Sequence, residues 1–195
     1  MRLASYETGR RPAQRAFLAL TGLLGSPIND VGKVSMRRPE FFGRPFMALA
    51  QRALRGRSGW SVGERELFAA VVSQANSCAF CVGTHGAIGG SALGLAVDES
   101  WRDGRFGARV TAVADFVDVL TRDPDSVGPE FVAAARAAGV DDAALAEAVY
   151  VAFAFNTVNR VADALGFEHR SDRELRRDAR FLRINGYRMP GFLLR

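Results

Sequence analysis

The feature that most constrains the fold is an apolar run that follows a helix-capping signal. In Ser61-Val62-Gly63-Glu64, a hydroxyl and a carboxylate stand three residues apart, as a capping box requires. The run from Leu67 to Val72 then presents apolar side chains on every side of the predicted helix. Because a helix of this kind must be surrounded by other elements, the segment predicts a helix buried in the interior.

Helix start and stop signals recur along the rest of the 195-residue chain. Pro39 and Glu40 suit a first turn, Asp141 is a good N-cap, and Gly139 and Gly166 are typical of helix C-termini. A chain of this length can bury one good core, so we predict an all-α, single-domain helical bundle. The predicted helices cover residues 11–24, 39–55, 129–139 and 142–165, with others that start near 61, 77, 110 and 171, and loops at 28–38 and 94–107.

Two segments of the C-terminal half carry more specific expectations. Residues 149–155 are apolar on all sides of their helix, which predicts core. Four polar side chains follow on this helix, Asn156, Asn159, Arg160 and Asp163. They either hydrogen-bond to one another or contact another subunit, or else they line a pocket near the thiols. The tail ends in Phe192, Leu193 and Leu194, an apolar end that we expect to dock on a neighbouring subunit.

Both cysteines of the chain lie in the segment 77–85, with one of its two histidines. Ser77 is a good N-cap, which would place Cys78 and Cys81 in a first helical turn, where the helix dipole favours a thiolate. His85 follows Cys81 by four residues and lies on the same face. A base beside a thiol at a helix start is typical of an activated nucleophile, so the segment predicts redox chemistry.

Other uses of a Cys-x-x-Cys pair fit less well. Covalent haem attachment needs histidine directly after the second cysteine, where Val82 stands. A zinc site needs two further ligands, for which the chain offers only His85 and His169. A disulfide that closes so small a loop contributes little stability. Dithiol chemistry is therefore the preferred interpretation, and no cofactor is expected.

Charge and hydropathy limit the partners. The net charge is +5, and all basic residues except Lys33 are arginines, but they are interleaved with 21 acidic residues and do not cluster. We therefore do not expect nucleic acid to bind. No apolar stretch approaches the roughly 20 residues that span a bilayer, so we expect no membrane association and a cytoplasmic protein.

The residues so far described resemble a known family. Glu66, eleven residues, Cys78-x-x-Cys81, three residues and His85 form a pattern similar to the redox-active branch of the alkylhydroperoxidase D-like family, whose fold is shared with carboxymuconolactone decarboxylases. The resemblance covers roughly residues 38–167. It implies a helical core there, preceded by an N-terminal helix and loop at 1–37 and followed by an arginine-rich, subunit-contacting helix and tail at 168–195.

By this resemblance the chain is a thiol-dependent peroxidase that reduces organic hydroperoxides. Cys81 would attack the peroxide, Cys78 would resolve the sulfenic acid into a disulfide, and Glu66 and His85 would relay protons. An external dithiol of lipoyl or thioredoxin type would then reduce the disulfide. The position of Cys78 nearer the helix start independently gives it a claim to the lower pKa. Phe80 departs from the family pattern, because the best-known peroxidase has histidine between its cysteines.

Two further classes of function remain open at this point. The chain could be a redox-responsive binding or sensor protein that turns over little, or a structural module that zinc stabilises. A decarboxylase is a weaker alternative, because the ring-lactone branch of the family lacks the dithiol. The resemblance also implies a homo-oligomer, which could be a dimer, a trimer or a hexamer.

Overall fold

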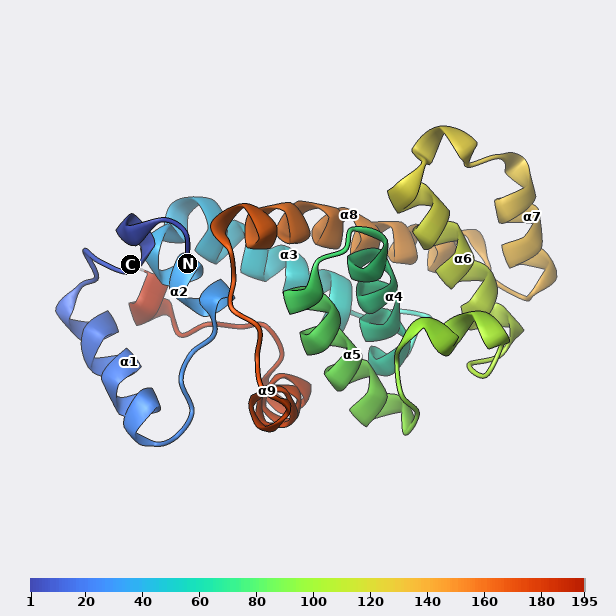
Figure 1. Ribbon diagram of the computed structural model, residues 1–195. Coiled ribbons are helices and arrows are strands. Elements are labelled where there is room, and N and C mark those ends of the chain that lie inside the picture. Colours follow the sequence, from blue (N-terminus) through green and yellow to red (C-terminus); the bar gives the residue numbers. More distant parts are fainter. Residues whose placement is uncertain (195) are drawn as a thin grey trace.

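All regular elements of the described chain are helical (Figure 1), which confirms the predicted all-α class. The computed structural model describes residues 1–194, apart from the side chains of residues 99 and 100. None of the described helices is long and apolar enough to cross a membrane. The longer helices are α1 (Pro12–Leu23), α2 (Asp30–Arg37), α3 (Arg44–Arg55), α4 (Val62–Ala75), α5 (Ala79–Leu93), α6 (Ala108–Arg122), α7 (Pro129–Ala137), α8 (Asp142–Leu165) and α9 (Asp172–Asn185).

Helix α4 lies at the centre of the core, in contact with α3, α5, α6 and α8. It begins with the predicted capping box: the Ser61 backbone N–H donates to the Glu64 carboxylate at 2.6 Å, and the Glu64 N–H donates to the Ser61 hydroxyl at 3.2 Å. All six side chains from Leu67 to Val72 are fully buried. The sequence pattern therefore identified the central helix correctly, because no side of α4 faces solvent along this run.

Helix α8 crosses the whole core above α3 and α4 (Figure 1). Its predicted ends are confirmed, since the Asp141 side chain accepts from the Ala144 N–H at 2.7 Å and Gly166 takes the left-handed conformation at φ +62°. The expectation that residues 149–155 are core on all sides is wrong. Tyr150 and Phe153 are 59% and 61% exposed, because the helix lies on the surface of the bundle and leaves one apolar stripe uncovered.

The predicted loop at 28–38 is also wrong, because it contains α2. Asn29 caps this helix by accepting from the Gly32 N–H at 3.1 Å, and Asp30 and Arg37 suit the two ends of its dipole. The predicted helix 39–55 is divided: Pro39–Gly43 forms one π-helical turn before α3 starts. A side chain at Gly43 would lie 2.4 Å from the Ser35 carbonyl oxygen, so the two segments pack at backbone distance.

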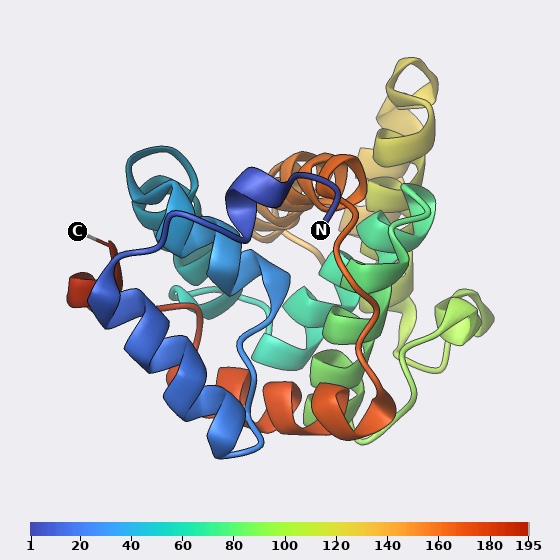
Figure 2. The same cartoon turned by 60° about the vertical axis from the view of Figure 1, so that its left-hand side comes forward.

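The C-terminal segment folds back along the bundle. Helix α9 packs against α5, below it in Figure 2. The chain then returns toward α1, where the Gln14 side chain donates to the Leu193 carbonyl at 2.9 Å. Of the three apolar residues at the end of the tail, Leu193 and Leu194 are buried within their own chain and only Phe192 is exposed. The expectation that all three dock on a neighbouring subunit is thus wrong for the two leucines.

Candidate functional site

The two cysteines lie at a tight reversal between α4 and α5. The Ser77 N–H donates to the Gln74 carbonyl and the Cys78 N–H to the Ser73 carbonyl, both at 2.9 Å, so the end of α4 holds the start of α5. Ser77 is not the N-cap that the sequence suggested: its φ is +58°, and Cys78 occupies the N-cap position. Ser77 instead makes the left-handed turn, a conformation that costs a non-glycine residue about 1–2 kcal/mol.

A glycine allows α4 and α5 to pack closely enough for their side chains to meet. A Cβ atom at Gly89 would lie 3.4 Å from both the Cβ of Glu66 and the backbone nitrogen of Leu67. Because the helices run antiparallel at this spacing, Glu66 near the start of α4 comes opposite His85 in the middle of α5. The reversal thus brings together two residues that lie 19 positions apart in the sequence.

The two thiols are free and buried. The hydrogen bond from the Cys81 thiol lowers the pKa of Cys78, although burial acts in the opposite direction, and the Cys81 backbone N–H lowers it further. The same hydrogen bond, together with burial, raises the pKa of Cys81 well above its ordinary value. The two opposite shifts in pKa therefore favour Cys78 over Cys81 as the thiol that ionises first.

His85 of α5 and Glu66 of α4 form a buried pair. His85 Nδ1 lies 2.6 Å from Glu66 Oε2, and the imidazole meets the Phe155 ring edge to face at 4.4 Å. Burial alone would raise the pKa of Glu66, but His85 and Arg55 outweigh it and hold that pKa below its ordinary value. Since Glu66 is a carboxylate, Nδ1 is the protonated nitrogen that donates to it, and Nε2 remains for proton transfer.

Two residues that the sequence analysis did not identify complete this cluster. Arg55 Nη1 lies 2.6 Å from Glu66 Oε1, and the Tyr187 hydroxyl donates to the same oxygen at 2.8 Å. The Tyr187 hydroxyl also lies 3.5 Å from His85 Nδ1. Burial, and then the Glu66 charge, raise the pKa of Tyr187 well above its ordinary value, so the phenol stays protonated. Arg55, Glu66, His85 and Tyr187 are called the relay cluster below.

The relay cluster joins segments that are remote in sequence. Arg55 is the last residue of α3, and Tyr187 follows α9 in the tail, with its N–H bonded to the Gln51 side chain at 2.8 Å. No local signal marks either residue. Tyr187 lies in a tail that the sequence pattern predicts to be irregular, so its position gave no indication of a role.

Of the polar residues of α8, only Asn156 forms the satisfied network that was one of the two predicted alternatives; Asn159 accepts from the Ser73 hydroxyl at 3.4 Å, but its side-chain nitrogen is buried without a hydrogen-bond partner. Asn156 accepts from the Asn76 side chain at 2.9 Å and donates to the Thr121 hydroxyl at 3.3 Å. Arg160 is exposed. Asp163 differs, because it acts to raise the pKa of Cys78. Of these polar residues, Asp163 is thus the one that influences the dithiol.

The described side chains do not form a metal-binding site. Within residues 1–194, no three His, Cys, Asp or Glu side chains gather in an arrangement that could hold a metal ion. His169 is exposed in the segment between α8 and α9. The residues that do come together are the ones that the motif predicted: Glu66 with His85, and Cys78 with Cys81.

Comparisons with known proteins agree with the motif and the fold. Residues 40–98, which contain Glu66, both cysteines and His85, match the carboxymuconolactone decarboxylase family. No curated protein matches the chain. A solved structure of an uncharacterized peroxidase-related protein from Silicibacter sp. is 24% identical, with a TM-score of 0.72 over 86% of this chain and 90% of that one. An uncharacterized peroxidase-related protein from Ralstonia eutropha, described as an alkylhydroperoxidase core, is 22% identical, with a TM-score of 0.68 over 85% and 90% of the two chains.

Proposed function

From a carboxymuconolactone decarboxylase family segment in an alkylhydroperoxidase D-like fold, we propose that the protein is a thiol-dependent peroxidase that reduces organic hydroperoxides. One observation carries the proposal. Two free, buried thiols stand three positions apart at the start of α5, and the same helix carries a histidine that a buried carboxylate orients. This arrangement combines an activated nucleophile with a proton donor for the leaving group.

The cycle balances with the groups present and one external reductant. A thiolate attacks the distal oxygen of the hydroperoxide, the O–O bond breaks, and the sulfur becomes a sulfenic acid while the alkoxide leaves and takes a proton to form the alcohol. The second thiol then attacks the sulfenic sulfur, a disulfide forms and water leaves. A dithiol of lipoyl or thioredoxin type reduces the disulfide by exchange and is itself oxidised.

The relay cluster has a defined part in this cycle. The ion pair with Arg55 and the contacts from His85 and Tyr187 keep Glu66 ionised, and Glu66 in turn fixes the imidazole ring. His85 Nε2 is then the atom that exchanges a proton with the thiol pair or with the departing alkoxide. Tyr187 and Arg55 are positioning residues, since they act on the imidazole through Glu66.

The resemblance and the electrostatics give different answers for the attacking sulfur. The resemblance assigns attack to Cys81, whereas the lowered pKa of Cys78 and the raised pKa of Cys81 favour a thiolate on Cys78. Single-turnover measurements on Cys78→Ser and Cys81→Ser separate the two assignments, because only the variant that retains the attacking sulfur consumes one equivalent of hydroperoxide and forms a sulfenic acid that dimedone traps.

Steady-state hydroperoxide consumption with dihydrolipoamide tests the proposal. Either cysteine-to-serine substitution is expected to abolish turnover, and His85→Gln to lower it about 100-fold or more, the contribution typical of a positioned acid or base. His169→Gln is the matched control, because this histidine is exposed and distant in sequence from the thiols. Turnover that persists in both cysteine variants would refute the proposal.

The burial of the thiols favours a second candidate. Cys78 and Cys81 are 0% and 2% exposed, so a redox-responsive protein that switches slowly is consistent with the same dithiol. The two functions differ in rate: a sensor forms the disulfide once for each oxidant encounter, and its steady-state turnover with any dithiol reductant stays negligible.

We also propose that copies of the chain associate. The exposed stripe of α8 that contains Tyr150 and Phe153 is apolar, and such surfaces often mark contacts between proteins. Light scattering after size exclusion gives the mass in solution. A monomer at all concentrations would exclude this proposal without affecting the dithiol cycle.

A further inference from the structure

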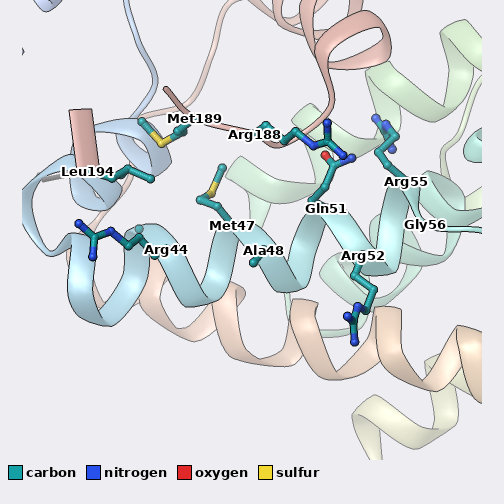
Figure 3. Close-up of a pocket in the computed structure, with 11 residues that line it drawn as sticks. Arg44, Met47, Ala48, Gln51, Arg52, Arg55, Gly56, Arg188, Met189 and Leu194 are labelled. Carbon is teal, nitrogen blue, oxygen red and sulfur yellow. The ribbon is translucent and has the colours of Figure 1, made fainter. Parts of the chain in front are cut away.

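A groove of ≈ 610 Å³ runs along α3, outside the relay cluster (Figure 3). One face of α3, at positions 44, 47, 48, 51, 52 and 55, forms its floor. Arg188, Met189 and Leu194 of the returning tail form the opposite side. This volume is in the range of sites that hold small organic ligands.

All charged side chains that line the groove are positive. Four arginines line it, at positions 44, 52, 55 and 188, and no acidic residue does. Within the described part of the chain, the guanidinium groups of Arg44, Arg52 and Arg188 have neither a hydrogen bond nor an ion pair, whereas ten other arginines are paired with acidic side chains. An arginine-lined groove of this kind favours a carboxylate or another planar anion.

Arg55 supplies an independent sign of a ligand. Its side chain is 92% buried (8% exposed) and its Nη1 is neutralised by Glu66, yet its Nε is buried without a hydrogen-bond partner. A buried donor of this kind normally has a partner. Because Arg55 lines the groove at its inner end, a polar group of a bound ligand can reach this part of the molecule.

The apolar side chains of the groove indicate the chemistry of the rest of the ligand, beyond its anionic group. Met47, Met189 and Leu194 line the end away from Arg55 (Figure 3). Methionine side chains are flexible and adapt to apolar ligands of varied shape. The combination of free guanidinium groups with thioethers fits a molecule that has both a carboxylate and a hydrocarbon portion.

We propose that this groove binds an amphipathic organic carboxylate, and that the hydroperoxide substrate belongs to this class. The second part rests on the proposed peroxidase function. The groove adjoins the relay cluster at two points: Arg55 belongs to both, and Arg188 directly follows Tyr187. A carboxylate on Arg188 is therefore held in the same groove that Arg55 lines, and Arg55 contacts Glu66.

Equilibrium binding to the full-length protein tests the groove without any turnover. Decanoate is the probe, and decanol is the neutral comparison of the same chain length. Decanoate is expected to bind about tenfold or more tightly than decanol and to lose about tenfold in Arg188→Gln, the effect of one charge-assisted hydrogen bond. Arg52→Gln is a second variant in case Arg188→Gln does not fold, and Arg173→Gln, an exposed arginine of α9 outside the groove, is the matched control.

Three outcomes would overturn the groove proposal: equal binding of decanoate and decanol, an equal loss in the Arg173→Gln control, or no binding at all. Loss of decanoate binding as the protein concentration rises would mean that a second copy fills the groove, and this too would overturn it.

Kinetics then separate this proposal from the peroxidase proposal. The kcat/KM of a fatty-acid hydroperoxide should exceed that of its methyl ester, and Arg188→Gln should remove the difference. Turnover of both substrates at equal rates, without decanoate binding, contradicts the groove and leaves the peroxidase intact. Decanoate binding without turnover of either substrate contradicts the peroxidase and supports the groove.

Discussion

The substitution Glu66→Gln removes the charge on which the relay cluster is built. Glu66 is fully buried, forms an ion pair with Arg55 at 2.6 Å, and accepts from His85 at 2.6 Å and from Tyr187 at 2.8 Å. Glutamine keeps the size of the side chain but leaves the buried Arg55 cation without a counter-charge, since its other acceptors are the Leu54 and Leu182 carbonyls. Loss of one partner from a buried ion pair costs about 3–5 kcal/mol.

Urea and thermal unfolding give the magnitude directly. For a chain of this length about 1 kcal/mol changes Tm by roughly 2–4 °C, so we expect Glu66→Gln to lower Tm by about 6–20 °C. The exposed ion pair between Glu40 and Arg38 provides the control: Glu40→Gln removes a similar contact at 2.7 Å in solvent and should change Tm far less. Equal effects of the two substitutions would refute the view that burial makes the Glu66 contacts important.

The same variant has a defined pH dependence. The pKa of Glu66 is lowered in the folded protein, so its contribution to stability is complete above the unfolded value near 4.5 and is lost as pH falls through the folded pKa. The difference in unfolding free energy between wild type and Glu66→Gln should therefore be constant at neutral pH and shrink below about pH 4.5. A difference that grows on acidification would contradict the assigned ionisation.

Three further substitutions, one of them with a control on α1, test other parts of the site. Tyr187→Phe removes a hydrogen bond to the Glu66 carboxylate and should cost about 1.5–3 kcal/mol in urea unfolding; an unchanged stability would show that the tail does not support the cluster. Gly89→Ala places a methyl group 3.3 Å from Val97 and 3.4 Å from Glu66 and should destabilise by about 1–3 kcal/mol, whereas Gly22→Ala on α1, with no atom within 4 Å, should stabilise by about 0.5–1 kcal/mol. Ser77→Gly relieves the left-handed turn and should stabilise by about 0.5–1 kcal/mol in thermal unfolding; a loss of stability would mean that the hydroxyl has a role that the fold does not reveal.

The elements that the sequence predicted well are those whose signals are local. The capping box at Ser61, the Asp141 cap and the glycine at 166 each act within a few residues, so the ends of α4 and α8 could be read from the chain alone. Helix α2 was missed because it is short and mostly polar. The outer face of α8 was misassigned because periodicity cannot tell a helix inside the core from one that lies on it.

The residues of the site also divide into those that a short sequence pattern marks and those that only the packing of the helices brings in. His85 was predicted from its spacing to the cysteines and Glu66 from the family resemblance, and α4 and α5 do bring them together because the chain reverses near Asn76. Arg55 and Tyr187 could not be predicted, since each reaches Glu66 only through the packing of α3 and of the tail against α4 and α5. Their role depends on tertiary structure that no short pattern encodes.

The most direct test of the dithiol cycle uses the reduced protein and one equivalent of an organic hydroperoxide. Intact mass, free-thiol titration and the yield of alcohol are measured on the same sample. The account predicts that both thiols disappear, that the chain becomes two hydrogens lighter through a Cys78–Cys81 disulfide, and that one alcohol forms per chain. Recovery of both thiols with the hydroperoxide unconsumed would contradict it.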